Sequence, residues 1–76
     1  MSQYVEDTAN ELADMALAEA AASGDEKIVD LIGEVVGASS QSLQEAYLTA
    51  IRVRRAETRA REILANAAAK RTGGGG

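Results

Sequence analysis

The longest stretch of this sequence without a helix breaker runs from Ser40 to Lys70 and contains neither glycine nor proline. As a single α-helix it would be about 45 Å long, because each residue adds about 1.5 Å. That length exceeds the ~30 Å diameter of a small domain, so other helices must lie along it. The whole chain has 76 residues, which is near the size where one core holds a fold only marginally. Help from a partner is therefore expected.

A first, shorter helix is predicted over residues 3–22. Its apolar side chains recur at helical spacing, while Asp7, Glu11 and Asp14 fall on the opposite face. The sequence then offers Ser23-Gly24 as a stop and Asp25 as an N-cap for a second helix. The shared apolar face of the first helix comprises Val5, Ala9, Leu12, Ala13, Ala16, Leu17 and Ala20.

A second helix is predicted over residues 26–36, in the most apolar part of the chain. Gly33 lies inside it and indicates either a slightly less stable helix or a close approach of another helix. The core-facing stripe of this helix comprises Ile28, Leu31, Ile32, Val35 and Val36.

The third helix is predicted over residues 40–70. Ser39, Ser40 or Ser42 can cap its start, and Ser42 and Glu45 have the spacing of a capping box. Alanine, the strongest helix former, occurs sixteen times in the chain, and no segment alternates with the period of a strand.

The predicted fold is therefore all-α. It is a hairpin of two shorter helices folded along one long C-terminal helix and completed as an oligomeric helix bundle. Residues 1–71 form a single helical domain in this interpretation, and residues 72–76 form a flexible glycine-rich tail.

A heptad seam, as in coiled coils, follows the third helix. Glu57 interrupts it with a charge that can pair with Arg54 and Arg61, and either fixes the register of a contact or lies where the seam faces solvent. A second apolar set on other sides of the helix (Tyr47, Leu48, Ile51, Ala56 and Ile63) indicates packing against more than one neighbour. The seam comprises Leu43, Ala46, Ala50, Val53, Glu57, Ala60, Leu64 and Ala67.

Charge divides sharply along the chain, whose net charge is −4. Residues 1–38 contain nine acidic residues and one lysine, a net charge of −8, whereas residues 39–76 have a net charge of +4. The two halves have the signs needed to neutralise each other, within one chain or between two copies.

Five arginines fall within residues 50–64. Arg52, Arg55 and Arg59 lie on one face of the predicted helix, and three interpretations of this face remain open: solvation, contact with an acidic helix, or contact with phosphates. Nucleic-acid binding is the least favoured, because the chain is acidic overall and its only aromatic residues are Tyr4 and Tyr47.

The composition argues against several other functions. Cysteine is absent, and so is histidine, which removes disulfides, thiolate or imidazole metal sites and the usual nucleophile pairs. We therefore expect no enzymatic activity and no cofactor. The carboxylates Asp7, Glu11 and Asp14 have the ordinary spacing of a solvated face, so no metal site is predicted. No signal segment or membrane attachment is indicated, and a cytoplasmic location is expected.

The function predicted is that of a self-associating protein–protein interaction module, such as an adaptor, assembly subunit, small chaperone or regulator. Its expected partner is a second copy, most simply in a dimer, or another protein. Arg54, Glu57 and Arg61 would set the register. The alternative is a small nucleic-acid-associated regulator that uses Arg52, Arg55 and Arg59. The predicted oligomer contact comprises Leu43, Tyr47, Ala50, Val53, Ala60 and Leu64.

Overall fold

The computed structural model of the protein describes residues 2–74. Its three helices confirm the predicted all-α fold, and no strand occurs within this range. A short π-helical turn follows the third helix, and Gly75 and Gly76, part of the predicted flexible tail, lie outside the described residues. The elements are α1 (Gln3–Ser23), α2 (Lys27–Gly37), α3 (Gln41–Ala69) and the π-helical turn (Lys70–Gly74).

Short polar residues and one glycine set the ends of the helices. The hydroxyl of Ser2 accepts a hydrogen bond from the Val5 amide, and Ser40 caps α3 in the same way. Ser40 is thus the cap among the three serines considered, and the predicted alternative Ser42 lies inside the helix. Gly24 ends α1 in the left-handed region at φ 75°, where a residue without Cβ is favoured.

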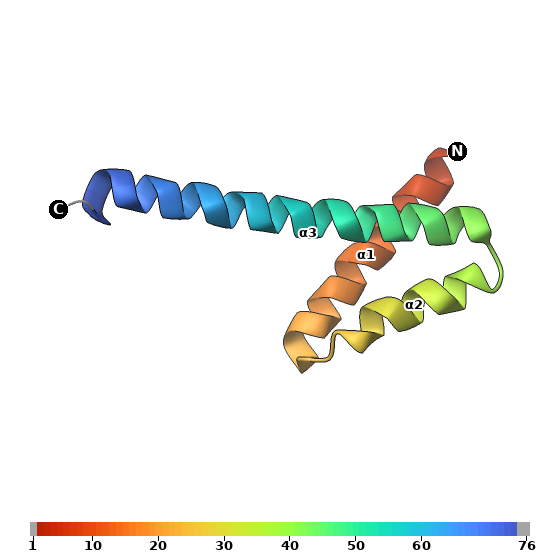
Figure 1. Cartoon of the computed structure of the whole chain (residues 1–76). Coiled ribbons are helices and arrows are strands. Elements are labelled where there is room, and N and C mark those ends of the chain that lie inside the picture. The colour runs from red at the N-terminus through yellow and green to blue at the C-terminus, as the bar shows by residue number, and fades with distance from the viewer. Residues whose placement is uncertain (1, 75–76) are drawn as a thin grey trace.

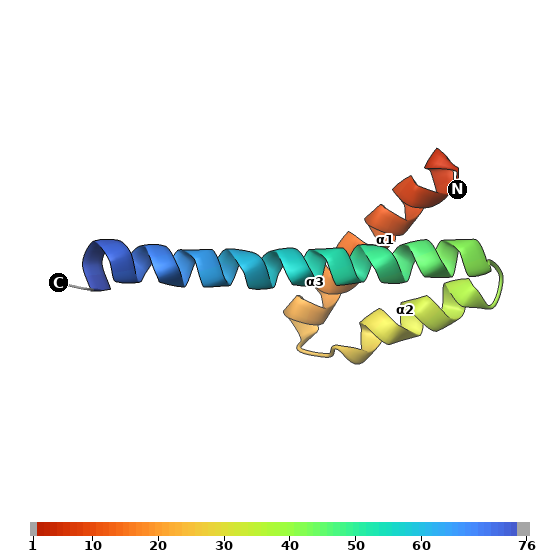
Figure 2. The same ribbon diagram turned by 45° about the horizontal axis from the view of Figure 1, so that its top comes forward.

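The core is narrow because α1 contributes mainly alanine to it. In Figures 1 and 2, α1 crosses the first half of α3 obliquely. Small side chains at the crossing let two helix backbones approach closely. The larger residues predicted on the same face (Val5, Leu12 and Leu17) are only half-buried. The buried residues of α1 are Ala9, Ala13, Ala16 and Ala20.

Tyr47 of α3 is the largest buried side chain among the described residues, with none of its surface exposed. Its hydroxyl donates a hydrogen bond of 2.6 Å to the carbonyl oxygen of Val29 in α2. Gly33 faces the ring, and its carbonyl accepts a second hydrogen bond from the Gln44 side chain at 2.9 Å. These contacts attach α2 to the first half of α3.

The helices α1 and α2 cover only the first half of α3. Ile51 is its last buried residue, and residues 55–72 are all exposed. Both ribbon views show this part of α3 extending beyond α1 and α2 (Figures 1 and 2). The radius of gyration is 16.0 Å, against about 11 Å for a compact chain of this length. We call residues 55–69 the α3 arm, and α1, α2 and residues 41–54 the head.

Gly33 provides a test of the packing around Tyr47. A Cβ at this position would lie 3.5 Å from Tyr47 Cε2 and 3.6 Å from Leu48 Cδ2, which is ordinary contact. Because alanine is a better helix former than glycine, Gly33→Ala should raise the free energy of unfolding in urea by about 0.5–1 kcal/mol.

Gly37→Ala is the matched control in the same helix. A Cβ there would collide with the Gln44 amide, which would have to leave its hydrogen bond with Gly33. We expect no comparable gain from Gly37→Ala. A loss of stability in Gly33→Ala would show that the contact with Tyr47 leaves no room for a methyl group.

Candidate protein interaction surface

Burial divides the six residues predicted to contact another copy into two sets of three. Tyr47 and Ala50 are buried in the core of their own chain, and Leu43 packs against that core. These three therefore have intramolecular neighbours. Val53 and Leu64 are 57% and 69% exposed, and Ala60 is exposed as well. Only this second half of the predicted contact is free to meet a partner.

The free residues belong to a continuous apolar stripe along α3. With 3.6 residues per turn, the stripe lies nearly half a turn away from the side of α3 that carries Tyr47 and Ile51. Ile63 is not part of the predicted heptad seam, but it lies beside Leu64 on this stripe and is 59% exposed. We call this set the arm stripe; it comprises Val53, Ala56, Ala60, Ile63, Leu64 and Ala67.

The residues predicted to set the register form two separate ion pairs. Arg61 pairs with Glu57 at 2.8 Å on the surface of the same helix. Arg54 does not pair with Glu57: its Nε donates to Asp14 Oδ1 in α1 at 2.6 Å, and its Nη1 donates to the Ala50 carbonyl. Arg54 lies where α1 crosses α3, so a carboxylate of the other helix is within reach.

The ion pair between Arg54 and Asp14 shifts the pKa of both groups. The hydrogen bond from Arg54 lowers the pKa of Asp14, with a smaller contribution from the positive charge of the guanidinium. The same hydrogen bond raises the pKa of Arg54. Burial raises the pKa of the Tyr47 hydroxyl, and the negative charge of Asp30 raises it further.

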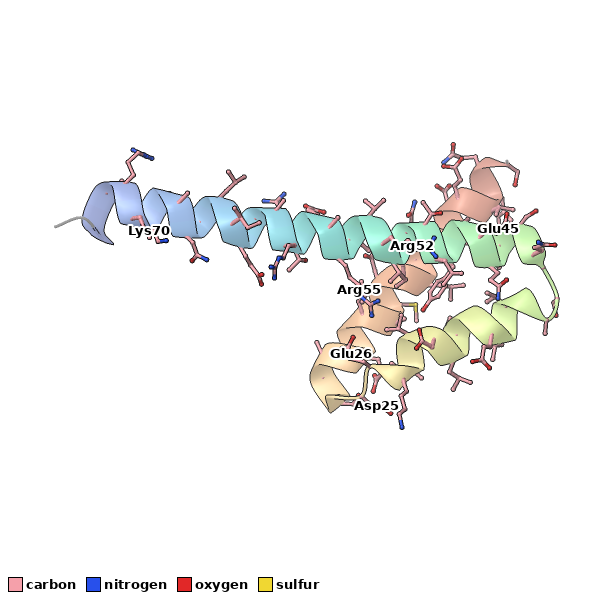
Figure 3. All side chains as sticks on the ribbon, in the orientation of Figure 1. Asp25, Glu26, Glu45, Arg52, Arg55 and Lys70 are labelled. Atoms are coloured by element: carbon pink, nitrogen blue, oxygen red, sulfur yellow. The ribbon has the colours of Figure 1, made fainter. Side chains whose placement is uncertain are left out.

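The arginine face of α3 is partly neutralised within the chain. Arg55 points toward Glu26 at the start of α2 (Figure 3), and their charged groups lie 3.2 Å apart. Arg52 and Arg59 are exposed and form no ion pair within residues 2–74. The acidic half of the sequence thus forms ion pairs with the basic half of the same chain at two points, Arg54–Asp14 and Arg55–Glu26.

A groove of about 280 Å³ lies between α1 and α2. Met15, 68% exposed, is on its rim, and Leu31 and Val35 of α2 are 52% and 59% exposed. The sequence pattern predicted that Leu31 and Val35 face the core. Their exposure shows that this prediction is wrong for these two residues. The groove, which sequence reasoning missed, is lined by Leu12, Met15, Ala16, Glu19, Ile28 and Ile32.

A second groove, of about 330 Å³, lies between α1 and α3. Val53 belongs both to this groove and to the arm stripe, so the two surfaces are continuous. Its lining residues are Glu6, Ala9, Asn10, Ala46, Thr49, Ala50, Val53 and Arg54.

Within the described part of the chain, no three carboxylates gather closely enough to hold a metal ion. No helix in the same range has the length and apolar character needed to cross a membrane.

Comparisons of the chain with protein-family models, with curated proteins and with solved structures gave no match.

Asp14→Asn tests the ion pair at the helix crossing. Because the folded state lowers the pKa of Asp14, the charged carboxylate stabilises the fold at neutral pH, and this contribution is lost as the pH falls through the lowered pKa. The urea midpoint of Asp14→Asn should therefore be lower than that of the unsubstituted protein at pH 7. The difference should disappear in acid.

Glu11→Gln is the control, since Glu11 is an exposed carboxylate of the same helix without an ion pair in residues 2–74. It should change the midpoint little at either pH. Equal midpoints for Asp14→Asn and the unsubstituted protein at pH 7 would contradict a stabilising role for the pair.

Proposed function

We propose that this protein is a non-enzymatic, self-associating helical interaction module whose contact surface is the α3 arm. Such a module acts as an adaptor, an assembly subunit, a small chaperone or a regulator. The observation that carries the proposal is that residues 55–69 continue α3 beyond every other helix of the described chain while exposing Ile63 and Leu64.

The energetics of the arm support this proposal. A helical segment of about 15 residues is marginal in water, because most helix stability in proteins comes from packing of an apolar face. Burial of one large aliphatic side chain contributes about 1.5–3 kcal/mol. Contact with another helix at Ile63 and Leu64 would thus stabilise both the assembly and the helical state of the arm.

The small residues of the arm stripe favour a helix as the partner. Ala56, Ala60 and Ala67 separate the larger side chains and permit close approach of a second backbone. Polar residues flank the stripe, as is typical of a surface that contacts another protein.

Leu64→Asp should abolish self-association. Leu64 is 69% exposed in the single chain, so a charge there leaves the head intact but prevents burial of the stripe. Light scattering behind a sizing column should give the mass of a dimer or larger assembly for the unsubstituted protein and of a monomer for the variant. Circular dichroism should show that the head remains helical.

Ala65→Asp is the matched control, because Ala65 is exposed on a side of the arm away from the stripe. It adds the same charge one residue further along and should leave the mass unchanged. A monomeric mass for the unsubstituted protein, at low and at high salt, would refute the proposal.

Phosphate binding by the arginine face is the second candidate function. Arg52 and Arg59 are free of ion pairs within residues 2–74, which favours it, but Arg54, Arg55 and Arg61 already contact carboxylates. A basic patch reduced in this way offers few charges to a phosphate backbone.

We expect no salt-sensitive binding of labelled duplex DNA or single-stranded RNA in fluorescence anisotropy at low ionic strength. Binding that weakens steeply with salt, and that Arg52→Ala combined with Arg59→Ala reduces, would instead support the nucleic-acid function.

A further inference from the structure

The large apolar side chains that remain mostly exposed fall into two groups on the described surface. One group, with Val53, Ile63 and Leu64, lies along the arm stripe. The other lies on α1 and α2; Met15 lines the groove between these helices, and Tyr4 lies about three turns away near the start of α1. The second group comprises Tyr4, Met15, Leu31 and Val35.

We propose that the α3 arm of one copy docks in the α1–α2 groove of a second copy. This inference rests on the proposed function and adds to it the surface that binds the arm. The groove and the exposed residues of α2 beside it lie on the head, so each copy carries one arm and one receiving surface.

The size of the groove fits aliphatic side chains of a helix. Its volume of about 280 Å³ lies just below the range of about 300–1,000 Å³ typical of small-molecule pockets. Leu12, Ile28 and Ile32 line it with apolar surface, and Glu19 is its one charged lining residue. Such a site accepts side chains like Ile63 and Leu64 from a neighbouring helix.

The two surfaces are also opposite in charge. Residues 55–72, the arm and the turn after it, contain five basic and two acidic residues, a net charge of +3, whereas residues 3–37 have a net charge of −8. Arg59 and Lys70 on the basic side, and Glu11, Glu19 and Glu34 on the acidic side, form no ion pair within residues 2–74. Opposite potentials steer association and select between partner surfaces.

Charge likewise argues against pairing of two arms. Two arms side by side, each with the turn after it, would bring together two segments of charge +3 (residues 55–72), and like charges at a contact are unfavourable. An arm on the acidic head would instead bring the unpaired Arg59 and Lys70 to a surface whose Glu11, Glu19 and Glu34 have no ion pair within residues 2–74. The second copy's head is therefore the occupant that the observations favour.

A mixing experiment tests the inference. Leu64→Asp damages the arm and Met15→Asp damages the groove; both residues are more than two-thirds exposed, so each variant should fold. Each variant alone should associate at least tenfold more weakly than the unsubstituted protein in sedimentation velocity. The 1:1 mixture should form a complex of two different chains, because one variant keeps an intact arm and the other an intact groove.

Ala21→Asp is the control for added negative charge on α1, since Ala21 is exposed and faces away from Met15. It should associate like the unsubstituted protein. If Met15→Asp retains the original mass while Leu64→Asp does not, or if the mixture stays monomeric, the arm binds elsewhere and the inference is overturned, while the proposed function stands. A monomeric unsubstituted protein would overturn both.

Discussion

The fold depends on one aromatic side chain between helices. Tyr47 fills the space between α3 and α2, and its hydroxyl is satisfied by the Val29 carbonyl at 2.6 Å. A buried hydroxyl without such a partner would be costly. Gly33 lies against the ring, and the Gln44 side-chain amide donates a hydrogen bond to the Gly33 carbonyl. Since α1 adds mainly alanines, no other buried side chain within residues 2–74 is as large.

The small size of this core explains why the arm is free. The helix α2 has 11 residues and α1 crosses α3 instead of running along it, so together they cover the long helix only as far as Ile51. Beyond that point, α3 continues because its sequence contains no breaker until the glycines. The same helix thus serves as core element in one half and as exposed surface in the other.

The charged residues of α3 also differ between the junction with the head and the far end of the helix. Arg54 and Arg55, at the junction between head and arm, pair with Asp14 and Glu26 of their own chain. Arg59 and Lys70, further along, have no carboxylate partner within residues 2–74. The junction is therefore neutralised internally, while the far end of α3 and the outer face of the head keep charges of opposite sign. This division of charge is the basis of the proposal that the arm binds a second copy.

Local sequence signals are sufficient to predict the three helices. Capping serines, the Ser23-Gly24 stop and the absence of breakers from Ser40 to Lys70 are local signals, because they act through backbone geometry within a few residues. The alanine face of α1 and the heptad seam of α3 also followed from periodicity, and so did the pairing of Arg61 with Glu57 four residues earlier.

Which neighbours these faces meet depends instead on how the helices pack against one another. One periodic seam contains Ala50 in the core and Leu64 in solvent, since periodicity does not specify where a crossing helix ends. Arg54 pairs with Asp14, forty positions away, because of the crossing angle of α1. The α1–α2 groove likewise arises where two helices meet, and the spacing along either helix alone does not encode it.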